Sequence, residues 1–401
     1  MKHFVWYFPQ HLHFFPKLQR SDWHRFLFAL LALTLFTISA TATFTWLSLS
    51  QMIVNSTEEA PSALPQSAEP TPEPTPDPLA AYGIALLGHG DPGHDGGLLT
   101  DSIMVAYVQP REERVTLISL PRDIWVELPL LETDEGLEYK GYKINAAYAI
   151  GTDQRQYPNR PKAFTGEAGG GTLAKYAIEQ VTGLHIPYFL AVNFSAFETA
   201  IDQLGGITVT VPRGFVDDYY PIPGEEENTC DFSEEDIEAI TATVSGEQLE
   251  RAFPCRYERL VFEAGTHTLD GETALKFARS RHSEQSGGDF ARAARQQAVV
   301  QGIKQQVINL NFIPKIPGLL QTLSWNVTTD IQPSQLEEWI DQSDELQTYP
   351  FSQIVLSTQN VLKDGRSGGQ YVLLPAEPAA GEYPWLEVHQ WIQTEIDSTD
   401  L

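Results

Sequence analysis

The stretch "SIMVAYVQPREERVTLISLP" (residues 102–121) holds two apolar segments rich in β-branched residues, separated by the charged sequence "REE". Such segments predict β-strands, and the charged residues between them predict a turn, so the stretch is a hairpin or two neighbouring strands. A third apolar segment, "GIALLG" (83–88), precedes the pair and ends in glycine. The three segments together predict the start of a buried sheet.

Helix and strand patterns alternate after this point. The predicted helices are "AAYAIG" (146–151), "GGGTLAKYAIEQVTG" (169–183, capped by Gly183) and "SAFETAIDQLGG" (195–206), and the predicted strands are "YFLAVN" (188–193) and "ITVTVP" (207–212). Glycine after the last periodic residue is typical of a helix C-terminus. This alternation favours an α/β domain with helices on both faces of one sheet.

The C-terminal part continues the mixed pattern. "DFARAARQQAVVQGIKQQVINL" (289–310) predicts a strong helix with Asp289 as its N-cap. Beyond it, 311–401 contains one further helix and one further strand, "PSQLEEWIDQS" (333–343) and "FSQIVLST" (351–358). This extension of the domain either adds strands to the same sheet or forms a small appended unit.

The N-terminal part has a different composition. Residues 26–49 contain no charged side chain and are long enough to cross a bilayer. The residues before them carry Lys2, Lys17, Arg20 and Arg25 against one acid, Asp22. The charge asymmetry predicts a cytoplasmic N-terminus (1–25), one transmembrane signal anchor (26–49) and an extracytoplasmic remainder. A cleaved signal peptide and a buried core helix are the alternatives.

Residues 50–80 are rich in Pro, Glu, Ser and Thr and predict an extended extracytoplasmic linker between membrane and domain. Residues 213–262 are acidic, lack a clear period and contain the two cysteines, Cys230 and Cys255. We interpret them as an insertion. In an oxidising compartment the cysteines predict a disulfide that tethers it, and two free buried thiols are the alternative.

The whole chain carries a net charge of −27, which argues against general binding to nucleic acid or to an anionic membrane face. Nevertheless "ARSRHSEQSGGDFARAARQQ" (278–297) holds four arginines. An anionic ligand must therefore be bound by a local cationic site.

The spacing of these arginines predicts how they converge. "TLDGETALKFARSR" (268–281) starts helical and becomes extended, so Arg279 and Arg281 point to the same side. In the next helix the apolar stripe of Val299 and Ile303 continues backwards to Gln296 and Arg292, which places both on the inward face. Guanidinium groups match pairs of phosphate oxygens, so a pyrophosphate site is the functional interpretation. A network of ion pairs with acidic residues is the structural one.

Three further motifs bear on this choice. "SLPRD" places Arg122 and Asp123 directly after a predicted strand, at an end where α/β sheets bind ligands. Asp101 precedes another strand and either holds Mg²⁺ against phosphate oxygens or forms a salt bridge. Lys143 lies before an alanine-rich helix and is either part of the site or a surface lysine.

With these motifs in order, residues 81–310 resemble the LytR-CpsA-Psr family. The matching blocks include "LLGHGDPGHDGGLLTDSIMVAYVQPREERVTLISLPRD", "KINAAYAIG" and "GTHTLDGETALKFARSRHSEQSGGDFARAARQQ". The resemblance implies a three-layer α/β/α catalytic domain with a central mixed sheet and a hydrophobic cavity for a polyprenyl chain. It implies a phosphotransferase that moves a glycopolymer from an undecaprenyl-pyrophosphate carrier to the cell wall, with peptidoglycan or another wall polymer as acceptor and Mg²⁺ (or Mn²⁺) as cofactor.

The resemblance also assigns roles by position. The residues matching the pyrophosphate contacts of the family are Arg122, Arg279, Arg281, Arg292 and Gln296. Asp101 matches a metal ligand of the family, and Asp289 and Lys143 match positions in the polar site that binds the pyrophosphate. Asp123 and Asp289 are candidate bases for the acceptor hydroxyl.

Two positions depart from the family pattern at the predicted metal site. Gly90 stands where the family has a second metal-binding aspartate, and Leu99 stands where it has an arginine. Asp91, one residue later, is the candidate substitute, and His89 and His94 are weaker ones. The same site would also serve a polyprenyl-pyrophosphate hydrolase, and a non-catalytic polysaccharide- or lipid-binding regulatory module would retain the cavity without turnover.

Overall fold

The computed structural model describes residues 52–55, 60–61, 77, 79–91, 97–245, 247–283, 287–309, 323, 326–342, 345, 348–378 and 383–398. The predicted cytoplasmic segment, the predicted anchor at 26–49 and most of the linker lie outside these ranges. Within them, no helix has the length and apolar composition needed to cross a membrane.

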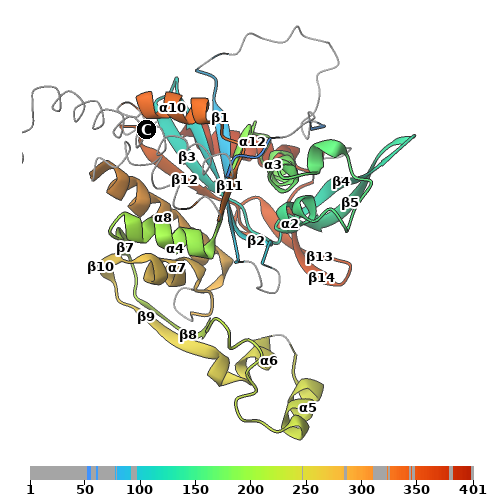
Figure 1. Cartoon of the computed structure of the whole chain (residues 1–401), viewed down its shortest axis with the longest axis vertical. Helices are drawn as coiled ribbons and strands as arrows, with labels where there is room; N and C mark the ends of the chain where they lie inside the picture. The colour runs from blue at the N-terminus through green and yellow to red at the C-terminus, as the bar shows by residue number, and fades with distance from the viewer. Residues whose placement is uncertain are drawn as a thin grey trace, which may run out of the picture. The chain divides into compact units, whose positions relative to one another are not determined.

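A six-stranded mixed sheet forms the centre of the unit Leu49–Leu401 (Figure 1). In spatial order its strands are β11 (Val327–Thr329), β6 (Tyr188–Asn193), β1 (Tyr82–His89), β2 (Thr100–Gln109), β3 (Arg114–Ser119) and β12 (Phe351–Val355). The three strands predicted first are its middle: β1 pairs antiparallel with β2, and β2 with β3. β6 is parallel to β1 and β12 is parallel to β3. The C-terminal segment therefore extends the sheet, because β11 and β12 are its two edge strands.

One face of the sheet is covered by α2 (Ala146–Thr152), α3 (Gly169–Thr182) and α12 (Leu386–Ser398). The largest apolar core lies here, where Leu87, Val105 and Ile118 of the sheet meet Leu173 of α3 and Ile392 of α12. Helix α3 ends as predicted at Gly183, which adopts φ of 72°, a left-handed conformation that glycine takes without steric cost.

Three helices lie on the other face: α4 (Phe194–Gln203), α7 (Gly271–Arg279) and α8 (Gly288–Asn309). Helix α8 packs against β3, β12 and the ribbon of β7 (Ile207–Val211) with β10 (Gly265–Leu269). A second core of buried residues joins α4, α7, α8 and this ribbon, with Phe277 and Val299 among its members. The two helical layers around one sheet give the predicted α/β/α order.

The remaining elements are peripheral. They are α10 (Pro333–Asp341), the 3-10 turns η1 (Lys162–Phe164) and η2 (Pro254–Arg256), the hairpins β4–β5 (Trp125–Thr133, Gly136–Lys143) and β13–β14 (Leu362–Ser367, Gln370–Pro375), and the elements of the predicted insertion. The insertion forms an arm in which β8 (Phe215–Pro221) pairs with β9 (Tyr257–Phe262), with α5 (Glu234–Thr243) and α6 (Glu247–Arg251) farther out (Figure 1).

Two local predictions are wrong. Arg279 is the last residue of helix α7 and does not lie in an extended segment. Asp270 caps the start of α7 by accepting from Thr273 N–H at 2.9 Å, and Ser280 N–H bonds to Lys276 O at 3.0 Å, so helical bonding continues to residue 279. Helix α8 begins at Gly288, which puts Asp289 inside its first turn instead of at the N-cap.

Candidate active site

A cavity of about 510 Å³ lies between the sheet and helices α4, α7 and α8. Most of its wall is apolar, with Leu86, Met104 and Leu190 from three strands, and Phe197, Val299 and Ile303 from two helices. This volume lies within the usual range for small-molecule sites, which combine apolar walls with a few polar groups.

The polar wall brings together residues that are far apart in the sequence. Five predicted site residues line this cavity: Asp101 of β2, Arg279 and Arg281 at and after the end of α7, and Arg292 and Gln296 of α8. The last two lie where helical periodicity placed them. One cavity thus has a hydrocarbon-like interior and a cluster of guanidinium groups in its wall.

Arg279 is held by aromatic groups. Its guanidinium lies 4.1 Å from the ring centroid of Phe194 and 5.7 Å from that of Tyr220, and Nη1 donates to the Tyr220 hydroxyl at 3.3 Å. Among the described residues, no carboxylate forms an ion pair with Arg279. Its fixed charge faces the cavity without an ion-pair partner from that part of the chain, and Glu198 interacts with it only at longer range. Such a group binds anions well when water is excluded.

Arg281 is positioned through its backbone by Asp217 of β8, a residue that sequence reasoning missed. The Asp217 side chain is fully buried. It accepts from Ser280 Oγ at 2.6 Å, from the backbone N–H of Arg281 at 2.9 Å and of His282 at 3.1 Å, and from Tyr219 N–H at 3.0 Å. Burial alone would raise the pKa of Asp217, but these four donors outweigh it and hold that pKa below its ordinary value. Asp217 therefore fixes the turn that presents Arg281 and His282 to the cavity.

Arg295 of α8 is a second residue that sequence reasoning missed. It is buried, its Nε donates to Phe277 O at 3.0 Å, and its Nη2 donates to Ser280 O. These bonds satisfy carbonyl groups at the end of α7, which lack helical partners. Burial lowers the pKa of Arg295 to about 10, while the nearby Asp217 carboxylate favours the charged form. The side chain therefore stays charged near neutral pH. Arg295 thereby ties α8 to the end of α7 that carries Arg279.

A chain of ion pairs lies beside the cavity. Arg122 Nη1 is 2.5 Å from Asp101 Oδ1, Arg122 Nε is 3.7 Å from Asp123 Oδ2, and Lys143 Nζ is 2.5 Å from Asp123 Oδ1. Only Asp101 of these four lines the cavity. Because two cations engage the Asp123 carboxylate, the geometry favours a positioning role for it over the predicted role as base. The side chain of Asp289, the other candidate base, lies outside the described part.

The predicted metal ligands do not form a complete protein cage. Asp91 Oδ1 accepts from Ser195 N–H at 3.2 Å, in the first turn of α4. His89 Nδ1 lies 2.8 Å from Gly90 O, and its ring stacks on Tyr148 with 5.3 Å between centroids. Across the described ranges no three or more His, Cys, Asp or Glu gather as a metal site. His94 lies outside them.

Mg²⁺ needs no such cage. It commonly binds through one or two carboxylates, with substrate phosphates and water completing the shell. Asp101 supplies one carboxylate in the wall that also carries the arginines, and one of its oxygens is engaged by Arg122. The donor set therefore fits a magnesium ion shared with a bound phosphate.

Comparison with known proteins identifies the family of this chain. The LytR_cpsA_psr family model matches residues 45–381. Among curated proteins, the polyisoprenyl-teichoic acid–peptidoglycan teichoic acid transferase TagU of Enterococcus faecalis is 28% identical over 253 residues, covering 62% of this chain and 61% of TagU. The regulatory protein MsrR of Staphylococcus aureus is 28% identical over 244 residues, covering 61% of this chain and 55% of MsrR.

These alignments leave more than a third of each relative unmatched.

Among solved structures, protein gbs0355 of Streptococcus agalactiae superimposes with a TM-score of 0.52 at 22% identity, covering 79% of this chain and 88% of that one. At this identity the likeness concerns the fold.

Proposed function

The chain belongs to the LytR-CpsA-Psr family, and from that premise we propose that it transfers a glycopolymer from a polyprenyl-pyrophosphate carrier to a cell-wall acceptor. One observation carries the proposal: Arg279 faces a largely apolar cavity with aromatic partners and, in the described part of the chain, no carboxylate at ion-pair distance. An apolar chain joined to a strong anion is the ligand that matches both properties. The name of the TagU relative supports the same reaction class.

The apolar wall of the cavity binds the prenyl chain, and the arginine cluster binds the pyrophosphate. The prenyl chain lies against Leu86, Leu190 and Ile303, and its transfer from water into this wall favours binding by about 25 cal/mol per Å² of apolar surface. The pyrophosphate lies against Arg279 and Arg281, whose guanidinium groups offer paired donors to its oxygens. Undecaprenyl pyrophosphate is the carrier that we propose, with peptidoglycan as acceptor.

In the reaction, an acceptor hydroxyl oxygen attacks the phosphorus that bears the glycan. A new P–O bond forms, the bond to the bridging oxygen breaks, and prenyl monophosphate leaves with the electron pair. The hydroxyl proton passes to solvent or to a basic group at the cavity wall, where His282 lies. The arginines offset the charge that develops on the phosphate oxygens, which is the main contribution a protein makes to phosphoryl transfer.

We propose Mg²⁺ as cofactor, with Asp101 as its protein ligand and Mn²⁺ as a substitute. When bound, the ion would neutralise phosphate oxygens. Arg122 pairs with Asp101 and orients its carboxylate, while Asp123 and Lys143 hold Arg122 in place.

Lipid binding tests this proposal directly. Purified full-length protein should bind octaprenyl pyrophosphate much more tightly than octaprenol, because only the pyrophosphate engages the arginines. Calorimetric titration in detergent measures both affinities. Equal affinity for the alcohol and the pyrophosphate would contradict the proposal that Arg279 and Arg281 bind the pyrophosphate.

Two other functions use the same cavity. A hydrolase would give the same prenyl product with water as acceptor. A regulatory lipid-binding module is favoured by the name of one relative, the regulatory protein MsrR. It would bind lipid pyrophosphate equally well with and without Mg²⁺ and release no product.

We also propose that the protein is a single-pass membrane protein whose domain lies outside the cell. Support comes from the uncharged segment 26–49 and the cationic residues before it. Protease added to intact cells should remove the domain, whereas a domain that stays fully protected would contradict this topology.

A further inference from the structure

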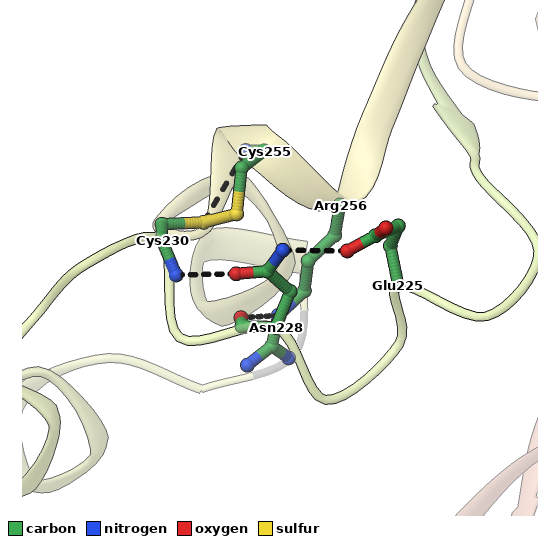
Figure 2. Close-up of a disulfide and its surroundings, with 5 residues drawn as sticks. All are labelled: Glu225, Asn228, Cys230, Cys255 and Arg256. Atoms are coloured by element: carbon green, nitrogen blue, oxygen red, sulfur yellow. Dashed lines mark hydrogen bonds between the residues drawn. A yellow bond between two sulfur atoms is a disulfide. The ribbon is translucent and has the colours of Figure 1, made fainter.

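The arm contains a disulfide-linked unit that reaches the cavity. Cys230 and Cys255 form a disulfide, with Cα atoms 5.5 Å apart, that joins the two sides of the arm (Figure 2). Glu226, Arg256 and Tyr257, which flank this disulfide, line the same cavity as the arginine cluster. The arm therefore contributes to the cavity as well as projecting from the domain.

Arg256 is fixed by its own side-chain contacts. Its Nε donates to Asn228 O at 2.7 Å, and its guanidinium lies 4.0 Å from the ring centroid of Phe253. Neither contact uses an N–H group of Nη1 or Nη2 as a hydrogen-bond donor, and the described residues supply no ion-pair partner for Arg256. The two terminal nitrogens can donate to a ligand from a preorganised position.

Asn228 connects Arg256 to the disulfide. Its Oδ1 accepts from Cys230 N–H at 2.9 Å and its Nδ2 donates to Glu225 at 2.5 Å, while its backbone carbonyl holds Arg256 (Figure 2). Cys230 and the next residue, Asp231, both have positive φ, 54° and 62°. Side chains other than glycine rarely take this conformation, so the surrounding contacts must hold the loop.

The pairing of β8 with β9 in the arm places Arg256 farther from the central sheet than the arginines proposed to bind phosphate. Tyr220 contacts Arg279, and two residues farther along, Ile222 N–H bonds to Arg256 O at 2.9 Å. Two residues of extended chain span about 7 Å. With the prenyl chain in the apolar part of the cavity, the group on the other side of the pyrophosphate would extend in this direction.

We propose that Arg256, held by the Cys230–Cys255 disulfide, binds the sugar attached to the pyrophosphate of the carrier. Its terminal N–H groups donate to sugar oxygens, and the adjoining Tyr257 offers an aromatic ring with a polar tip. The inference rests on the proposed function and adds a glycan-recognition residue supplied by the arm. It also predicts that reduction of the disulfide weakens recognition of the sugar without affecting the prenyl pyrophosphate.

Two lipids separate the sugar contact from the pyrophosphate contact. We would titrate full-length protein in detergent with farnesyl pyrophosphate and with farnesyl pyrophosphate bearing N-acetylglucosamine. Arg256→Ala should weaken binding of the sugar-bearing lipid about tenfold, the loss expected for paired hydrogen bonds, and that of the bare lipid less than twofold.

Arg259→Ala is the matched control, because Arg259 lies on the same arm, is paired with Asp218 at 3.3 Å and does not line the cavity. This variant should leave both affinities unchanged. If Arg256→Ala weakens both lipids equally, or neither, the inference is overturned while the proposed function stands. Wild-type protein that binds neither lipid would overturn both.

The role of the disulfide needs its own measurement. Mild reduction of folded wild-type protein should give the same selective loss as Arg256→Ala, and reduction of the Arg256→Ala variant should add less than twofold, because the two changes act through one contact. Circular dichroism after reduction checks that the domain stays folded. If reduced protein is still folded and binds the sugar-bearing lipid with full affinity, the disulfide does not hold Arg256 in place and this part of the inference is overturned.

Discussion

Arg279→Ala should lower the rate of glycopolymer transfer at least about 100-fold while leaving the fold intact. The magnitude follows from removing one preorganised cationic donor from a charge-stabilising site, which costs about 10²–10³ in rate. Arg279 is the residue with the clearest anion-binding environment, because its partners are Phe194 and Tyr220. Arg281→Ala should give a loss of similar size.

Arg279→Lys should recover little activity, since an ammonium group cannot reproduce the paired donors of a guanidinium. The free energy of unfolding of Arg279→Ala should fall by no more than about 1 kcal/mol, the usual scale of an exposed or half-buried cation–π contact. Denaturant unfolding and transfer rate, measured on the same preparation, give both quantities.

Lys276→Ala is the control on the same helix. Lys276 lies one turn before the end of α7, pairs with Glu258 and Glu272 at 2.8 Å each, and does not line the cavity. Its loss should leave transfer within a few-fold of wild type. An Arg279→Ala variant that unfolds much more easily yet transfers at the normal rate would show that Arg279 holds the fold instead of the substrate.

Asp217→Asn should destabilise the domain by about 2–4 kcal/mol and reduce transfer by a large factor. An amide has one acceptor oxygen and a donor group, so it cannot accept the four bonds that the carboxylate receives. It also removes the negative charge near the buried Arg295. Loss of a buried partner of a charged group typically lowers the free energy of unfolding by an amount of this size. The turn at residues 280–282 would also loosen, which would displace Arg281 and reduce transfer.

The stability difference between wild type and Asp217→Asn should depend on pH. The pKa of Asp217 is depressed in the folded state, so the carboxylate contributes stability above its unfolded value of about 3.9. That contribution is lost as the pH falls through the lower folded pKa. Denaturant unfolding at pH 7 and at acidic pH should therefore show that the difference in free energy of unfolding between wild type and Asp217→Asn is largest near neutrality. This difference should decrease below about pH 4.

Asp218→Asn is the control for this prediction. The neighbouring Asp218 is largely exposed and pairs with Arg259 on the arm surface, so its loss should cost less than about 1 kcal/mol. Equal destabilisation by the two substitutions would contradict the role assigned to the buried network around residue 217.

The sequence predicted those parts of the fold that depend on local pattern. Apolar segments, two of them rich in β-branched residues, identified β1, β2 and β3, and Gly183 marked the end of α3 correctly. Helical periodicity in α8 also placed Arg292 and Gln296 on the side that lines the cavity. In each case the signal lies within a few residues of the feature that it predicts.

Features that depend on distant contacts were not predicted. The chain leaves α7 after Arg279, where Asp217, more than sixty residues earlier, accepts from the backbone of 281 and 282. The role of Arg295 likewise requires the end of α7 to lie beside α8. Residues 213–262 have no clear period, so nothing in them marked Asp217 or Arg256 as part of the cavity wall.

The most direct test of the central claim is to follow the prenyl product of a lipid-linked, radiolabelled glycan with and without peptidoglycan. We expect that prenyl monophosphate is released together with labelled peptidoglycan, that release nearly stops without the acceptor, and that Arg279→Ala abolishes both. Release at the same rate without peptidoglycan would identify a hydrolase. Tight binding with no release under either condition would identify a regulatory lipid-binding protein, and either result would contradict the account.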